Sequence, residues 1–94
     1  MALSITKQSG TYEINGELNS QTINSIKNYF ELLIDQSAYI KLSINKIKGM
    51  DSAGVKFISS LYKKAVKKNK AFFIVDLYDK ELVQLFKKEN IFTY

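Results

Sequence analysis

The sequence contains no cysteine, no histidine and no arginine, and the first two absences exclude whole classes of chemistry. Without cysteine there is no disulfide framework, no thiolate nucleophile and no thiolate metal site. Without histidine the chain lacks the usual general base and the commonest metal ligand. Ser-His-Asp and Cys-His catalysis are therefore excluded, and we expect a protein that is not an enzyme and carries no metal and no cofactor.

Long apolar runs are also missing. No stretch approaches the ~20 apolar residues that a membrane-spanning helix needs, and the first residues lack the apolar core of a signal peptide. The length of 94 residues suits one hydrophobic core. We therefore predict a single domain over residues 1–94 that resides in the cytoplasm and does not insert into a membrane.

The charge is basic, with a formal net charge of +5 and fourteen basic residues that are all lysine. Such a balance is compatible with a nucleic acid, an anionic membrane or an acidic protein as partner. Contacts to guanine are made mostly by arginine, so its absence argues against nucleic acid, and a low-GC genome also explains the lysines. A small nucleic-acid binder rests on charge alone, and we predict no nucleic-acid partner.

Hydropathy patterning predicts the strands. Apolar and polar residues alternate over residues 3–7, 12–15 and 40–45, and residues 71–75 form a continuous apolar strand. The turn residues Gln-Ser-Gly at positions 8–10 indicate that the first two strands form a hairpin. Residues 91–94 are expected to add a short last strand.

Apolar residues at spacings of three and four predict three helices. The first carries Ile23, Ile26, Phe30 and Leu33 on its buried face and ends near Asp35. The N-cap candidates are Asn19 or Ser20 for the first helix, Asp51 or Ser52 for the second and Asp79 for the third.

The order of these elements is strand-strand-helix-strand-helix-strand-helix-strand, which implies parallel strands joined by right-handed helical crossovers. Strict alternation in residues 40–45 indicates that one face of the sheet is wet, except near residues 72–75. We therefore predict a single α/β domain. Its sheet is mixed but mostly parallel, with an antiparallel strand at the N-terminus and helices packed mainly on one face.

The segment from residue 46 to 55 connects a parallel strand to the second helix. Sites in open α/β sheets favour the crevice beyond the carboxyl ends of strands, and a helix N-terminus presents unpaired N–H groups. A hydroxyl at this point, on Ser52, would be exposed and would accommodate a phosphate. The same residues also suit a structural role, since Asp-Ser is a common cap and Gly54 can serve close helix–sheet packing.

A phosphate on Ser52 is expected to change binding and to leave the fold intact. Its interaction with the dipole at the helix N-terminus stabilises the helix by about 0.3–1 kcal/mol. It also adds roughly −1.5 to −2 charges beside Asp51, in a surface that a partner must desolvate. The predicted device is a local switch that works without refolding.

Three blocks of the sequence resemble the anti-sigma-factor-antagonist family of STAS domains. Residues 50–55, Met-Asp-Ser-Ala-Gly-Val, are similar to that family's phosphorylation segment, Asp-Ser-Ser/Thr-Gly-Leu/Val. Residues 16–19, Gly-Glu-Leu-Asn, together with Thr22, resemble its Gly-Glu-Leu/Ile-Asp stretch. Residues 79–92 resemble its third helix and last short strand, so that the resemblance covers nearly the whole chain in order.

The resemblance implies a regulatory module. In that family the serine after the aspartate is phosphorylated by an ATP-binding anti-sigma kinase and restored by a phosphatase, and the unmodified form binds the kinase and frees the sigma factor. Carried over, Ser52 is the phosphoacceptor, and Gly54 is the small residue that admits the partner. The implied partner surface consists of Asn19, Asp51, Ser52, Ala53, Gly54 and Lys56.

Two residues depart from the family pattern. Asn19 stands where the family has an aspartate near the phosphorylation site, and Ala53 replaces a second hydroxyl, as also occurs in STAS proteins that phosphate does not switch. An alternative is therefore a STAS subunit of a lipid-transport complex that docks constitutively on an ATPase subunit. Asp76 and Asp79 are a weak candidate cation site, because Asp79 is more simply a helix cap.

Overall fold

The structure is a computed structural model that describes residues 3–91. The described chain begins with an antiparallel hairpin. Strand β1 (Ser4–Gln8) pairs with strand β2 (Thr11–Leu18), and Ser9 and Gly10 between them have φ values of 52° and 80°. Positive φ at both central residues is what a two-residue turn needs if it is to match the twist of its strands. The hairpin predicted from the Gln-Ser-Gly signal is confirmed.

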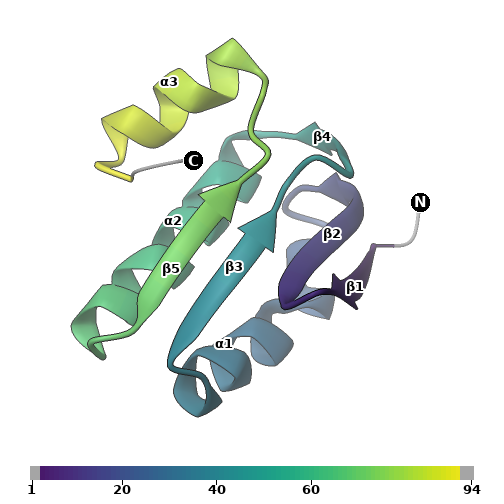
Figure 1. Cartoon of the computed structure of the whole chain (residues 1–94). Helices are drawn as coiled ribbons and strands as arrows, with labels where there is room; N and C mark the ends of the chain where they lie inside the picture. Colours follow the sequence, from purple (N-terminus) through teal and green to yellow (C-terminus); the bar gives the residue numbers. More distant parts are fainter. Residues whose placement is uncertain (1–2, 92–94) are drawn as a thin grey trace.

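Parallel pairing builds the rest of the sheet. Strand β3 (Tyr39–Ser43) lies between β2 and strand β5 (Ala71–Val75) and is parallel to both, which gives the order β1-β2-β3-β5 (Figure 1). Ile40 pairs with Phe72 and Leu42 with Ile74, and all four side chains are buried. These buried pairs point to the same face, because alternate residues of a strand share a face.

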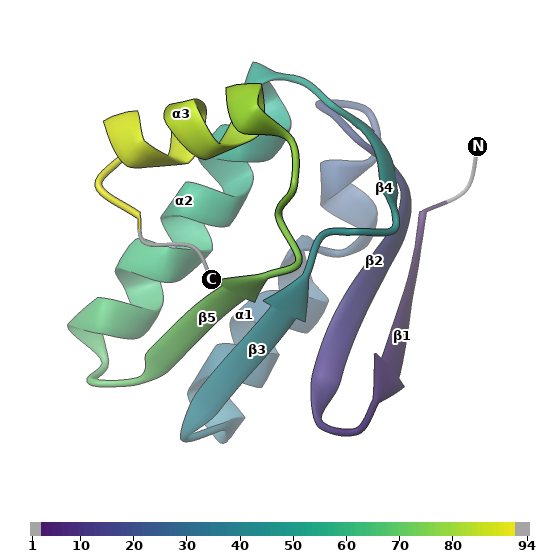
Figure 2. The same cartoon turned by 45° about the horizontal axis from the view of Figure 1, so that its top comes forward.

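The helices cover that face. Helix α1 (Lys27–Gln36) and helix α2 (Ser52–Lys67) lie behind the sheet, and helix α3 (Lys80–Lys88) packs beside α2 at the end of β5 (Figures 1 and 2). The predicted fold class is confirmed: one α/β domain with a mixed sheet and three α-helices. Its core includes the fully buried Ile14, Phe30, Ile34, Leu42, Ile58, Ile74 and Phe86.

One strand of the sheet was not predicted. Residues 47–50, expected to be part of a connection, form strand β4 (Ile47–Met50), which pairs in parallel with the second half of β2. This pairing has a bulge between Gly16 and Glu17, where Gly16 has a φ of 115°, and the residues of β2 that pair with β3 come earlier, at Tyr12 and Glu13. The long strand β2 therefore holds β3 and β4 one after the other along the same edge.

The first predicted helix is divided. A 3₁₀ helix, η1 (Ile23–Ser25), comes before α1, and the break falls at Ile26. Ser25 Oγ donates a hydrogen bond to the Thr22 carbonyl at 2.6 Å, and such local side-chain bonds compete with α-helical pairing. Ile34 is fully buried and was missed, whereas Leu33 is only half-buried.

The other face of the sheet is largely open, as predicted. Along β5, Phe72 and Ile74 are buried under the helices, and Phe73 and Val75 are half-buried on the opposite face. Of the last predicted strand only Ile91 falls among the described residues, where it is in no strand, and residues 92–94 lie outside them. Within residues 3–91 no helix is long and apolar enough to cross a bilayer.

Candidate functional site

The candidate site is built on the N-terminus of α2, which Asp51 caps. Asp51 has extended backbone angles and accepts a hydrogen bond on Oδ1 from the Gly54 N–H at 3.0 Å. This contact satisfies one of the four N–H groups that the first turn of a helix leaves unpaired. The cap predicted for Asp51 or Ser52 is therefore formed by Asp51.

Ser52 is consequently the first residue inside the helix. Its side chain is exposed, and within residues 3–91 its hydroxyl makes no side-chain hydrogen bond. Lys56 is exposed one turn further on, at the spacing that places two side chains next to each other on a helix surface. A negative charge on Ser52 would thus meet the positive end of the helix dipole and a lysine neighbour.

Gly54 is buried, and its role is in packing. A Cβ atom at this position would lie 2.5 Å from the Leu18 carbonyl oxygen and 2.6 Å from Met50 Cγ. The missing side chain therefore lets the first turn of α2 approach the end of β2. A partner cannot contact Gly54 directly, so the structure supports the helix–sheet packing that was the alternative interpretation of this glycine.

Asn19 lies at the same end of the sheet. Leu18 pairs with Met50, which comes two residues before Ser52. The half-buried Asn19 accepts hydrogen bonds on Oδ1 from the N–H groups of Gln21 at 2.9 Å and Thr22 at 3.2 Å. An amide oxygen performs this turn-closing role as an aspartate would, without the negative charge.

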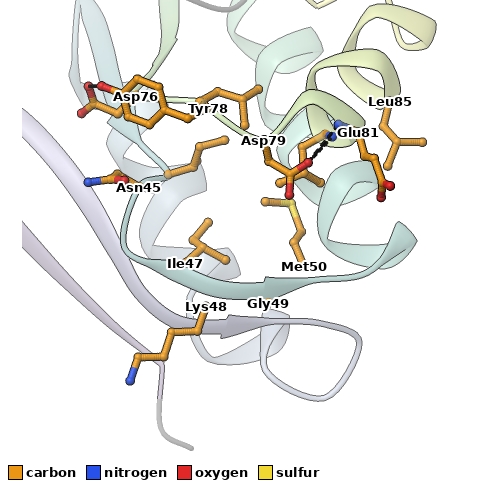
Figure 3. Close-up of a pocket in the computed structure, with 13 residues that line it drawn as sticks. Asn45, Ile47, Lys48, Gly49, Met50, Asp76, Tyr78, Asp79, Glu81 and Leu85 are labelled. Carbon is orange, nitrogen blue, oxygen red and sulfur yellow. Dashed lines mark hydrogen bonds between the residues drawn. The ribbon is translucent and has the colours of Figure 1, made fainter.

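A cavity near the N-terminus of α2 was not predicted from the sequence. It has a volume of about 310 Å³ and lies between β4 and α3, at the carboxyl ends of β3 and β5 (Figure 3). Two segments that are distant in the sequence, residues 44–50 and 76–85, form it, which is why no local motif indicated it. Those that line it include Ile47, Met50, Asp76, Tyr78, Asp79, Glu81, Leu82 and Leu85.

The lysine-rich surface of α2 is partly used by the fold. Lys64 pairs with Glu31 at 3.6 Å and Lys68 pairs with Asp35, and both pairs join α2 to α1. The Lys68 ammonium holds the pKa of Asp35 below its usual range. Solvent screens pairs as exposed as these, so they contribute little to stability.

Among residues 3–91 no group of three or more Asp or Glu side chains is arranged to hold a metal ion. Asp79 instead caps α3, accepting from the N–H groups of Glu81 at 2.9 Å and Leu82 at 3.3 Å. Asp76 accepts from the hydroxyl of the buried Ser43 at 2.8 Å and from that of Tyr78 at 3.3 Å.

We expect Asp51→Ala to lower the free energy of unfolding by about 1 kcal/mol, the usual cost of a lost N-cap. Urea denaturation followed by circular dichroism measures this difference. Asp51→Asn is the matched control, because its amide oxygen can still accept from Gly54, and it should stay close to the wild type. Equal stability of the alanine and asparagine variants would show that the cap contributes nothing.

The mixed sheet, the helices on one face and the exposed serine at the start of α2 define a small α/β domain with an accessible hydroxyl at a helix N-terminus. The chain belongs to the STAS domain family, because the sequence pattern of that family matches residues 2–93. A search of curated proteins found no match.

Two solved structures share the fold. One is the anti-sigma factor antagonist SpoIIAA in its unphosphorylated form, with a TM-score of 0.72 and 18% identity over 92% of this chain and 82% of that chain. The other is an anti-sigma factor antagonist from Mycobacterium paratuberculosis, with a TM-score of 0.77 and 16% identity over 99% of this chain and 84% of that chain.

Proposed function

We propose that this domain is a non-enzymatic binding module that docks on a serine kinase acting as an anti-sigma factor and is released when that kinase phosphorylates Ser52. A phosphatase restores the binding form. The observation that carries the proposal is the exposed hydroxyl of Ser52 at the first position of α2. Phosphorylation and dephosphorylation of Ser52 take place in the cytoplasm, where ATP is available to the kinase.

The surroundings of Ser52 fit both states of such a switch. In the unmodified form, Ser52 presents a small uncharged side chain between Asp51 and Ala53, with Lys56 one turn further on. The absent side chain of Gly54 lets this turn pack against the end of β2, next to Asn19. In the modified form the phosphate meets the helix N-terminus and Lys56, so the fold keeps its stability. The added charge instead opposes a partner that must desolvate this surface.

The likeness to two anti-sigma factor antagonists supports the choice of partner class. Asn19 leaves the neighbourhood of Ser52 with one carboxylate fewer than an aspartate would supply. The approaching ATP is anionic, so this substitution reduces the local repulsion and does not remove any hydrogen bond of the turn, because the amide oxygen makes them. A phosphorylated Ser52 is therefore compatible with asparagine at position 19.

The test is phosphopeptide mapping of the chain produced in its native host. We expect one phosphate, on Ser52, and its complete loss in Ser52→Ala. Ser20→Ala is the matched control, since Ser20 is an exposed serine at the same end of the domain, and it should retain the phosphate. A phosphate that persists in Ser52→Ala would contradict the proposal, as would an unphosphorylated chain bound to the ATPase subunit of a transporter.

A further inference from the structure

The cavity between β4 and α3 has an apolar floor and an acidic rim. Ile47, Met50, Leu82 and Leu85 supply apolar surface, and three of the chain's nine acidic residues stand around it. Among the described residues, the one cationic member of its lining is Lys48, whose side chain extends away from the others on the far side of β4 (Figure 3). The acidic residues are Asp76, Asp79 and Glu81.

The charge around the cavity is therefore opposite in sign to the formal net charge of the whole molecule, which is +5. The carboxylates are spread around the opening, and within residues 3–91 no three of them converge as metal ligands do. The volume of about 310 Å³ is at the small end of the range for ligand pockets. A single extended side chain with an apolar stem and a cationic end matches this size and this distribution of charge.

The cavity is also continuous with the proposed docking surface. Met50 lines it and is followed directly by Asp51 and Ser52. The N-terminus of α2 lies at the carboxyl ends of the parallel strands (Figure 1), and so does the cavity (Figure 3). A protein that covers Ser52 therefore reaches the opening of the cavity without a second interface.

We propose that this cavity receives a lysine or arginine side chain of the protein that docks at Ser52. The stem packs on Ile47, Met50 and Leu82, and the cationic group faces the acidic rim to which Asp76, Asp79 and Glu81 contribute. The proposal rests on the proposed function for the identity of the docking protein. It adds a second contact, which recognises the partner by charge and does not depend on the state of Ser52.

The test combines Asp76→Asn and Glu81→Gln in one variant. The amide oxygen that Asp76→Asn introduces can accept from Ser43 as the carboxylate does, and asparagine tolerates the φ of 59° at this position. Glu81 takes part in none of the ion pairs of residues 3–91. The double variant is therefore expected to fold, and Glu81→Gln alone is the second variant if it does not. Asp79 is left in place because it caps α3.

The affinity for the partner that phosphorylates Ser52 is measured by titration calorimetry. We expect the double variant to bind about tenfold more weakly, with a smaller dependence on salt, because a cation–carboxylate contact is lost. Glu13→Gln, on the hairpin strand β2, is the control and should bind like the wild type. An unchanged affinity in the double variant, beside a strong effect of Ser52→Asp, would overturn the cavity contact and leave the proposed function standing.

A second measurement does not depend on the partner. The ¹⁵N-labelled domain is titrated with Nα-acetyl-lysine N-methylamide, and with the norleucine analogue that has the same stem without the ammonium group. We expect saturable shifts at the amides of Ile47, Met50 and Leu82 with the lysine probe alone, and their loss in the double variant. Selective shifts would support the cavity even if no partner depends on Ser52, and equal or absent shifts with both probes would overturn it.

Discussion

The Ser52→Asp protein is expected to bind its partner at least about a hundredfold more weakly than the wild type, since ~3 kcal/mol of lost binding free energy has that effect. The melting temperature should not fall below the wild-type value. The two effects separate because they arise at different places: the new charge opposes the partner's desolvated surface, whereas inside the domain it meets a favourable environment.

The favourable environment has two parts. A carboxylate in the first turn of a helix contributes about 0.3–1 kcal/mol through the dipole. Lys56, one turn further on, adds a surface pair of about 0.2–0.5 kcal/mol. Calorimetric titration against the partner and thermal unfolding of the free domain measure the two quantities independently.

Ser20→Asp is the control for Ser52→Asp, because it adds the same charge at an exposed serine at the same end of the domain. It should change the affinity far less. If Ser52→Asp binds as tightly as the wild type, charge at this position does not govern docking. If it unfolds the domain, the switch does not act on the surface alone.

The second large effect is expected for Gly54→Ala, which should lower the free energy of unfolding by about 1–3 kcal/mol through overpacking. The added methyl would lie 2.5 Å from the Leu18 carbonyl oxygen, and a backbone atom held in a sheet cannot move away as a side chain can. Helix propensity works in the opposite direction by about 1 kcal/mol, so a net loss would demonstrate the steric contact.

Gly49→Ala is the matched control for Gly54→Ala. A Cβ atom at Gly49 meets only Glu17 Cγ, at 3.8 Å, which is an ordinary contact. Thermal unfolding should separate the two variants by about 4–8 °C for each kcal/mol in a domain of this size. A Gly54→Ala protein as stable as the control would contradict the close approach of α2 to β2.

The parts of the fold predicted correctly are those with a local physical cause. Residues 71–75 form a strand because a short apolar run of β-branched and aromatic residues suits one. The caps at Asp51 and Asp79 were predicted because a carboxylate before an apolar-periodic segment accepts the first free N–H groups. The exposure of Ser52 follows from the cap, since the next residue stands at the open end of the helix.

The predictions that failed depend on partners distant in the sequence. Residues 47–50 carry no strand signal stronger than that of a loop. They form β4 because β2 continues past the residues that pair with β3 and offers a free edge there. The break before α1 depends on hydrogen bonds of Asn19, Thr22 and Ser25, which compete with the helical pattern of the apolar residues.

The sequence by itself determined the fold class, the caps of α2 and α3 and the place of Ser52, because these depend on residues within one turn or one strand of each other. The cap predicted at Asn19 or Ser20 was wrong, since Thr22 precedes η1 and Ile26 precedes α1, neither with a side-chain cap. Only the tertiary structure decided that Gly54 is a packing residue and that a cavity with three carboxylates opens beside the site. Both features require β2, β4 and α3 to meet, and that meeting is set by strand pairing and core packing over separations that no local pattern encodes.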